Sequence, residues 1–165
     1  MNAGAFGGEL SQVIVGISGV TNEGDYKRWA RNQICFNYRE TALPAKFIVT
    51  EAEFGLSPKT VEEGKLGIED FRKQRNRTQP RGYPNAGSVF KNPPGAHAGK
   101  IIEALGWKGR AEGAAQVSGR HANFILNMGG ATASQVWNLV KEMQDHVWKT
   151  RKIWLEPEIR RVGEW

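Results

Sequence analysis

The sequence is short of cysteine, of long hydrophobic runs and of acidic residues. It contains one Cys among 165 residues, which excludes an intramolecular disulfide framework and a zinc site built from cysteines. No apolar run approaches the roughly 18 residues that suggest a membrane-spanning helix. The Gly-rich opening over residues 1–10 carries no basic residue, so we expect no secretory signal peptide. These absences predict a cytoplasmic protein that does not act at a membrane.

Charge and apolar content together indicate a folded, basic protein. Lys and Arg number 23 against 17 Asp and Glu, which gives a net charge of +6. An apolar fraction of 39% with six Trp provides enough apolar surface to form a core. The length fits one domain or two small ones. An excess of basic residues suits the binding of nucleic acid and of anionic small molecules equally well.

Hydrophobic periodicity and turn residues predict a mixture of strands and helices. Val13, Val15 and Ile17 alternate as in a half-buried strand, and residues 21–25 are typical of a hairpin turn. The further predicted elements are a strand at 47–49, a helix over 58–75 capped by Ser57, an extended loop over 78–95, a helix over 96–105, strands at 115–118 and 123–127, a helix over 133–149, and a last strand at 153–155. This order predicts a layered α/β (α+β) fold.

Ser88 lies in a Pro-flanked loop that can present its hydroxyl at a fixed position. Lys91 and Asn92 follow it and supply a cation and an amide, which suit phosphate or carboxylate groups. The Gly-x-Ser-x-Gly pattern of a nucleophile elbow is absent. The spacing leaves a Ser–His–Asp arrangement open, although three scattered His more often cap helices or lie on the surface.

Other polar motifs have simple structural explanations. Arg39 suits a carboxylate clamp because its guanidinium group donates two parallel hydrogen bonds. The dipeptide Tyr38-Arg39 by itself, however, favours a surface Arg paired with Glu40. Glu158 lies beside Pro157, which confines this stretch to an edge strand or a bulge. Chemistry that uses a pair of carboxyl groups would need a second one across a cleft. Cations near residues 72–77 suit a helix C-terminus. Nucleic-acid binding lacks a recognition module or interleaved aromatic residues.

Taken together, the motifs resemble the UDP-N-acetylenolpyruvoylglucosamine reductase (MurB) family, the flavoenzymes of peptidoglycan precursor synthesis. The matching stretches are NAGAFGGE at 2–9, YR at 38–39, QP at 79–80, GSVFKNP at 87–93, AGKIIE at 98–103, AQVS at 115–118, HANFI at 121–125, ATA at 131–133 and LEPEIR at 155–160. Any one of them is weak, but their order and spacing follow the family across nearly the whole chain. Thr41 stands where the family usually has Ser.

The resemblance covers only the C-terminal part of the family. It implies that residues 1–44 are the tail end of a PCMH/VAO-type FAD-binding domain and that residues 45–165 form a MurB C-terminal-type substrate domain. The first flavin-binding domain and the Gly-rich loops that hold the FAD pyrophosphate would lie upstream. We therefore expect a missing N-terminal FAD domain and a truncated form of the enzyme.

The resemblance implies a UDP-N-acetylmuramate dehydrogenase that uses NADPH and FAD to reduce UDP-N-acetylglucosamine enolpyruvate. The expected catalytic residues are Arg39, Ser88 and Glu158; the expected substrate-binding residues are Tyr38, Lys91, Asn92, Arg75 and Arg77; Asn2, Gly4, Gly7 and Arg160 are expected to contact the cofactor. No metal is implied. The alternatives are a non-catalytic UDP-sugar-binding fragment and, less favoured, a basic nucleic-acid-binding domain.

Overall fold

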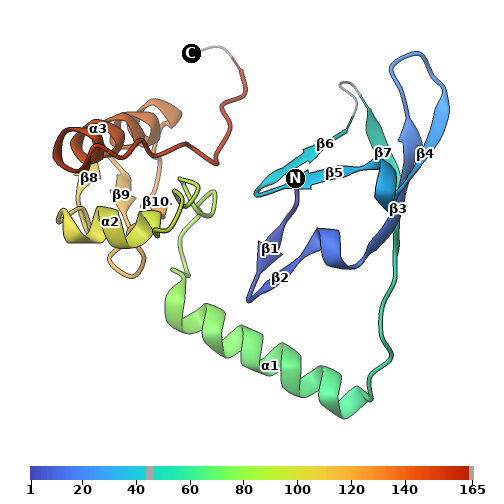
Figure 1. Ribbon diagram of the computed structural model, residues 1–165. Helices are drawn as coiled ribbons and strands as arrows, with labels where there is room; N and C mark the ends of the chain where they lie inside the picture. Colours follow the sequence, from blue (N-terminus) through green and yellow to red (C-terminus); the bar gives the residue numbers. More distant parts are fainter. Residues whose placement is uncertain (44–46, 164–165) are drawn as a thin grey trace. The chain divides into compact units, whose positions relative to one another are not determined.

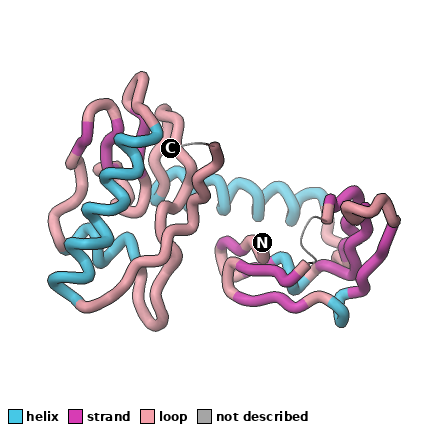
Figure 2. Tube along the Cα trace, turned by 90° about the horizontal axis from the view of Figure 1, so that it is seen from above, coloured by secondary structure: helices cyan, strands magenta, loops and turns pink. Residues whose placement is uncertain are grey.

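The chain forms two compact units. The structure, a computed structural model, describes residues 1–43 and 47–163. The first unit covers residues 1–71, and the second begins at Arg72 (Figure 1). Strands make up much of the first unit, whereas short strands, helices and long loops make up the second (Figure 2). The fold is therefore mixed α/β, as the residue pattern predicts.

A three-stranded antiparallel sheet forms the centre of the first unit. Its order is β4-β3-β7, with β3 at Ile14–Val20, β4 at Tyr26–Ala30 and β7 at Ile48–Phe54. The hairpin predicted around residues 21–25 is confirmed, since β3 pairs with β4 from Gly16 and Ala30 to Val20 and Tyr26. A small core packs on the sheet. Its buried members are Ile14, Ile17 and Ile34, with Leu10, Trp29, Phe36, Leu43 and Phe47 packed against them.

Two further hairpins in this unit were not predicted from the sequence. One joins β1 (Gly4–Ala5) to β2 (Gly8–Glu9), and the other joins β5 (Cys35–Asn37) to β6 (Glu40–Ala42). Strands of two or three residues are too short to show an alternating pattern, so periodicity cannot detect them. Short 3₁₀ turns at Leu10–Gln12 and Arg31–Gln33 connect these elements to the sheet.

The predicted domain boundary between residues 44 and 45 lies outside the described residues, so the boundary stays a prediction. Strand β7 follows it, but β7 pairs with β3 from Ile14 and Phe54 to Val20 and Ile48. These backbone hydrogen bonds keep the strand in the first unit. Helix α1 (Val61–Thr78) spans the change from the first unit to the second.

Helix α1 begins later than the sequence pattern predicts, and Ser57 is not its cap. Thr60 takes that role because its Oγ1 accepts a hydrogen bond from the backbone N–H of Glu63 at 3.2 Å. The Thr60 backbone N–H in turn donates to the Glu63 carboxylate at 2.9 Å. This reciprocal pair is a capping box, and the helix accordingly begins at Val61.

The second unit is built around helix α3 (Ala133–Arg151) and an antiparallel sheet of order β10-β9-β8. The strands are β8 (Ala111–Glu112), β9 (Ala115–Val117) and β10 (Ile125–Asn127), and helix α2 (Ala98–Ala104) belongs to the same unit. The predicted capping box between Thr132 and Gln135 at the start of α3 is confirmed. The largest fully buried side chains include Phe90, Ile102, Leu139, Met143 and Leu155.

The prediction of a last strand at 153–155 is wrong. Leu155 is buried in the core, but its carbonyl accepts a hydrogen bond from the Gln144 side chain of α3 at 2.7 Å. That carbonyl is thus bonded to a helix side chain instead of a neighbouring strand. Two residues after Leu155, Pro157 forms an isolated β-bridge with Phe90. None of the helices in the described residues is long and apolar enough to cross a membrane.

Candidate functional site

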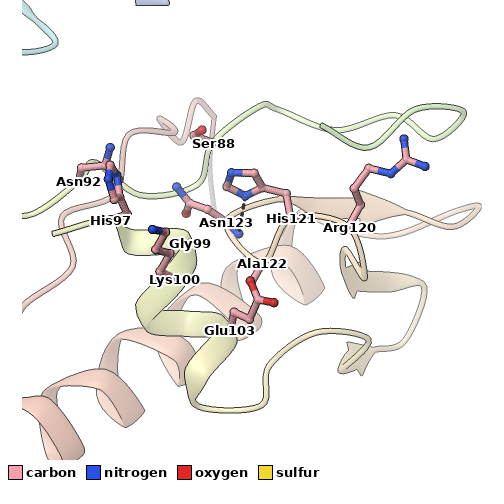
Figure 3. Close-up of a pocket in the computed structure, with 10 residues that line it drawn as sticks. All are labelled: Ser88, Asn92, His97, Gly99, Lys100, Glu103, Arg120, His121, Ala122 and Asn123. Atoms are coloured by element: carbon pink, nitrogen blue, oxygen red, sulfur yellow. Dashed lines mark hydrogen bonds between the residues drawn. The ribbon is translucent and has the colours of Figure 1, made fainter. Parts of the chain in front are cut away.

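A polar pocket of about 300 Å³ lies in the second unit (Figure 3). Three segments contribute to its wall: the loop over 78–95, helix α2 with the residue before it, and the connection between β9 and β10. Its lining residues are Ser88, Asn92, His97, Gly99, Lys100, Glu103, Arg120, His121, Ala122 and Asn123. The pocket thus collects polar residues that are up to 35 positions apart in the sequence.

Asn123 holds the backbone that carries Ser88. The side chain of Asn123 accepts from the Phe90 N–H at 2.9 Å and donates to the Phe90 carbonyl at 2.8 Å. Its own carbonyl accepts from the Val89 N–H at 2.8 Å. Asn123 is 3% exposed, so water does not compete for these bonds. The loop after Ser88 is consequently fixed to the β9–β10 connection.

The C-terminal segment pairs with the same loop on another edge. The Glu158 N–H donates to the Val89 carbonyl at 2.8 Å, and the Lys91 N–H donates to the Glu156 carbonyl at 2.9 Å. The Lys91 ammonium also forms a 2.6 Å ion pair with the Glu156 carboxylate. The predicted residues Ser88, Lys91 and Glu158 therefore lie on directly paired backbone segments, although Glu158 and Lys91 are not among the lining residues of the pocket.

Asn92 lines the pocket and also accepts a hydrogen bond from the start of helix α2. Its side-chain oxygen accepts a hydrogen bond from the backbone N–H of Ala98 at 3.0 Å. This bond satisfies one of the helix donors that lack an intrahelical partner. Asn92 therefore couples the position of α2, and with it Lys100, to the loop that carries Ser88.

Cations predominate around the pocket. Lys100 and Arg120 line it, and Glu103 is the single acidic lining residue, which also pairs with Lys108. Arg120 donates to the Asn76 carbonyl at 2.7 Å. This bond ties the pocket to the last turns of α1, where the predicted residues Arg75 and Arg77 lie. Such a charge balance suits an anionic ligand.

A hydrogen bond and burial both favour the neutral form of His121. Its Nδ1 accepts a hydrogen bond from the Asn123 backbone N–H at 3.2 Å, which leaves the proton on Nε2. Burial, with a smaller contribution from Lys108, lowers the pKa of His121 below its ordinary value of 6.5, while Glu103 opposes the shift. Helix α2 approaches the ring closely at Gly99, where a Cβ would lie 2.8 Å from the His121 Cε1.

Lys100, Arg120, His121 and Asn123 were not predicted as site residues. They lie in or next to the motifs at 98–103 and 121–125, but in the sequence each resembles an ordinary surface or turn residue. Asn123 is recognised only through its partner Phe90, 33 positions away. No group of three or more His, Cys, Asp or Glu in the described ranges is placed to hold a metal ion.

The remaining predicted residues are divided between the units. Tyr38 and Arg39 form the turn between β5 and β6 in the first unit, and the Arg39 guanidinium lies 5.7 Å from the Tyr38 ring centre. The Arg39 Nη1 donates to the Gly4 carbonyl at 3.1 Å. The predicted clamp and the predicted cofactor-contacting hairpin over 2–9 are therefore in contact. Arg160 is exposed in the C-terminal segment of the second unit.

Comparison with known proteins identifies relatives over the whole chain. The family model for the C-terminal domain of UDP-N-acetylenolpyruvoylglucosamine reductase matches residues 79–162. The reductase of Agathobacter rectalis is 41% identical in an alignment of 165 positions, which covers 99% of this chain and 52% of that protein. The reductase of Alkalilimnicola ehrlichii is 43% identical over 164 residues, 99% of this chain and 55% of that protein.

A solved structure agrees with these relatives. The crystal structure of UDP-N-acetylenolpyruvylglucosamine reductase (MurB) from Thermus caldophilus superposes with a TM-score of 0.87 at 33% identity. The match covers 97% of this chain and 57% of that one. The chain thus spans about half the length of the curated relatives that it matches.

The lowered pKa of His121 predicts a pH dependence of stability. Below an ordinary pKa of 6.5 the unfolded chain binds a proton at this side chain more readily than the folded chain does. The free energy of unfolding should therefore fall as the pH falls through that value. His121→Gln, which still offers an oxygen to the Asn123 N–H, should show a smaller fall between about pH 7.5 and about pH 5. Urea unfolding at both pH values measures this, and an unchanged fall would contradict it.

Proposed function

Because the chain belongs to the UDP-N-acetylenolpyruvoylglucosamine reductase (MurB) family, we propose that it carries the substrate-binding part of a cytoplasmic UDP-N-acetylmuramate dehydrogenase. The reaction would be the NADPH- and FAD-dependent reduction of UDP-N-acetylglucosamine enolpyruvate in peptidoglycan precursor synthesis. One observation supports this most: Ser88 lines a cation-rich pocket and is followed by Val89, whose carbonyl bonds to Glu158.

The pocket is the proposed site for the charged part of the UDP-sugar. Lys100 and Arg120 would neutralise the diphosphate, and the neutral His121 would donate a hydrogen bond from Nε2. The side-chain amide group of Asn92 would donate a further hydrogen bond to the diphosphate. A volume of about 300 Å³ is at the lower end for ligand pockets, so it would hold part of the ligand. Arg75 and Arg77, in the last turn of α1, would add positive electrostatic potential.

Ser88 is the proposed proton donor. Reduction of the enolpyruvyl double bond leaves negative charge on the carbon beside the carboxylate, and that carbon must then take a proton. A hydroxyl is a weak acid, so Ser88 would act only next to such a charge and in a positive field. Lys91 is the proposed source of that field, in part offset by Glu156 at 2.6 Å.

Arg39 and Glu158 are proposed to stabilise the same developing charge. The guanidinium fork of Arg39 would hold the substrate carboxylate by parallel hydrogen bonds, with Tyr38 beside it. Fixed donors aimed at a developing negative charge are usually worth about 3–4 kcal/mol. Glu158 would support the enolate from a protonated or hydrogen-bonded carboxyl group.

FAD, reduced by NADPH, would supply the hydride when bound. Gly7 fits a contact with this flat group because it is exposed and has no atom within 4 Å of the position of a Cβ. The backbone of the β1–β2 turn can therefore be approached closely. Asn2 fits such a contact poorly, since it is 3% exposed and its side chain bonds to protein groups. Gly4 and Arg160 stay proposed contacts.

A second candidate function is non-catalytic binding of a UDP-sugar. Its support is that every lining residue of the pocket belongs to the second unit, whereas the chain spans about half the length of its relatives. Binding of the nucleotide sugar would then need only this unit. The two candidates share the pocket and differ in whether the chain contributes to reduction.

Both candidates predict a specific role for Lys100. Lys100→Gln should weaken binding of UDP-N-acetylglucosamine by about five- to tenfold, because a charge-assisted contact with phosphate is lost. Lys141→Gln is the matched control, since it removes another exposed helix lysine, one that lies outside the pocket. Isothermal titration calorimetry measures both affinities. Equal affinities for the two variants would contradict the proposed pocket.

The catalytic proposal predicts a selective effect of Ser88→Ala, measured after the chain is joined to the preceding half of a relative. Flavin reduction by NADPH needs no proton from Ser88 and should proceed at nearly the normal rate. Reoxidation by the enolpyruvyl substrate should slow by about 10²–10⁴-fold, the usual effect of losing a general acid. Stopped-flow absorbance follows both steps.

Ser57→Ala provides a control, because that hydroxyl was predicted as a helix cap and does not serve as one. It should leave both steps unchanged. If Ser88→Ala slows the two steps equally while the melting temperature is unchanged, Ser88 is not the proton donor.

A further inference from the structure

Two hairpins of the first unit are joined at two points. The β1–β2 hairpin and the turn between β5 and β6 lie side by side in Figure 1. The Arg39 Nη1 donates to the Gly4 carbonyl at 3.1 Å, and the Asn2 side-chain amide donates to the Asn37 carbonyl at 3.4 Å. The turn that carries Arg39 is therefore connected to the opening segment of the chain on both sides.

Asn2 uses all of its polar groups in this connection. Besides the bond to Asn37, its Nδ2 donates to the Glu9 carboxylate at 2.8 Å, and its Oδ1 accepts from the Ser11 N–H at 3.0 Å. An Asn side chain offers two donor hydrogens and one oxygen, so each has a partner here. Since Asn2 is 3% exposed, this arrangement fixes the orientation of its amide.

Glu9 fixes Asn2 in turn. One oxygen of its carboxylate accepts from Asn2 and also from the Ser11 hydroxyl, at 3.3 Å. The Glu9 backbone N–H donates to the Gln12 side chain at 3.1 Å, and Glu9 pairs with Gly4 across the two short strands. A carboxylate at the base of the hairpin therefore helps to place the Gly4 carbonyl that receives Arg39.

The backbone around Arg39 requires such support. Arg39 has a φ of +57°, a left-handed conformation that non-glycine residues rarely adopt and that persists only where neighbouring groups enforce it. Gly4 is equally constrained, because a Cβ there would lie 3.0 Å from the Gly8 carbonyl oxygen. The contact between Arg39 and Gly4 thus depends on two closely specified backbone positions.

We propose that Asn2 and Glu9 are positioning residues for Arg39, and that they determine how strongly the chain distinguishes a substrate carrying a carboxylate from one without it. This inference rests on the proposed function. An Arg side chain held at one nitrogen loses less conformational freedom on binding a carboxylate. Asn2 then acts through Arg39 and does not itself contact a ligand.

The test compares two ligands on the full chain: UDP-N-acetylglucosamine enolpyruvate and UDP-N-acetylglucosamine, which lacks the enolpyruvyl carboxylate. The wild-type chain should prefer the first by about tenfold or more, the usual effect of a charge-assisted hydrogen bond. Asn2→Ala should reduce this preference to within about threefold of unity, while the affinity for UDP-N-acetylglucosamine stays unchanged. Calorimetric titration gives both affinities.

Two Glu9 variants and one control keep the test decisive if Asn2→Ala fails to fold. Glu9→Ala removes an exposed side chain and should also lower the preference, whereas Glu9→Gln keeps an oxygen for Asn2 and should retain most of it. Asn22→Ala, in the exposed β3–β4 turn, should change neither affinity.

Each outcome decides a different point. If the wild-type chain shows no preference, the proposed role of Arg39 fails and this inference fails with it. If the wild type prefers the enolpyruvyl ligand and the Asn2 and Glu9 variants keep that preference, only the positioning role is wrong. Equal weakening of both ligands in folded Glu9→Ala would likewise overturn it, because a general structural effect does not discriminate between them.

Discussion

The candidate site depends above all on the buried amide of Asn123. Its side chain satisfies both backbone groups of Phe90 at a position that is almost fully buried. A buried backbone donor or acceptor without a partner costs about 1–3 kcal/mol. Loss of this side chain would leave two such groups without a hydrogen-bond partner at once. The loop that carries Ser88 has no regular secondary structure of its own, and Asn123 supplies the hydrogen bonds that a neighbouring strand would otherwise give.

Around this bond the second unit brings together polar side chains from three segments. The β9–β10 connection brings His121 and Arg120, helix α2 brings Lys100, and the C-terminal segment brings Glu158 to the other edge of the loop. Backbone hydrogen bonds or a bond to a side chain hold each segment in place, as where Asn92 accepts from the first N–H of α2. The segments that carry these polar groups are thus held by the fold before any ligand binds, which lowers the entropic cost of binding.

The sequence predicts those parts of the structure that depend on local signals. The hairpin turn at 21–25 and the capping box of Thr132 with Gln135 involve residues close together in the chain, and both are confirmed. The strand expected at 153–155 failed because a distant helix residue, Gln144, takes the Leu155 carbonyl. No local pattern contains that partner.

The same distinction applies to the site. Ser88 and Asn92 were predicted from a motif, and both line the pocket. Asn123 was not, because its importance comes from a partner 33 residues away. The hydrogen bonds of Asn2 to Asn37 and of Arg39 to Gly4 likewise join residues 35 positions apart. Motifs in the sequence therefore predicted two of the lining residues, whereas the hydrogen bonds that position them required the structure.

Binding of the UDP-sugar in the pocket around Ser88 is the core of the proposed function. It can be tested by titrating the ¹⁵N-labelled chain with UDP-N-acetylglucosamine and following the NMR amide shifts. We expect the largest shifts in the segments that line the pocket, 88–92, 97–103 and 120–123, and not at the exposed end of α3. Shifts confined to other segments, or none at saturating ligand, would contradict it.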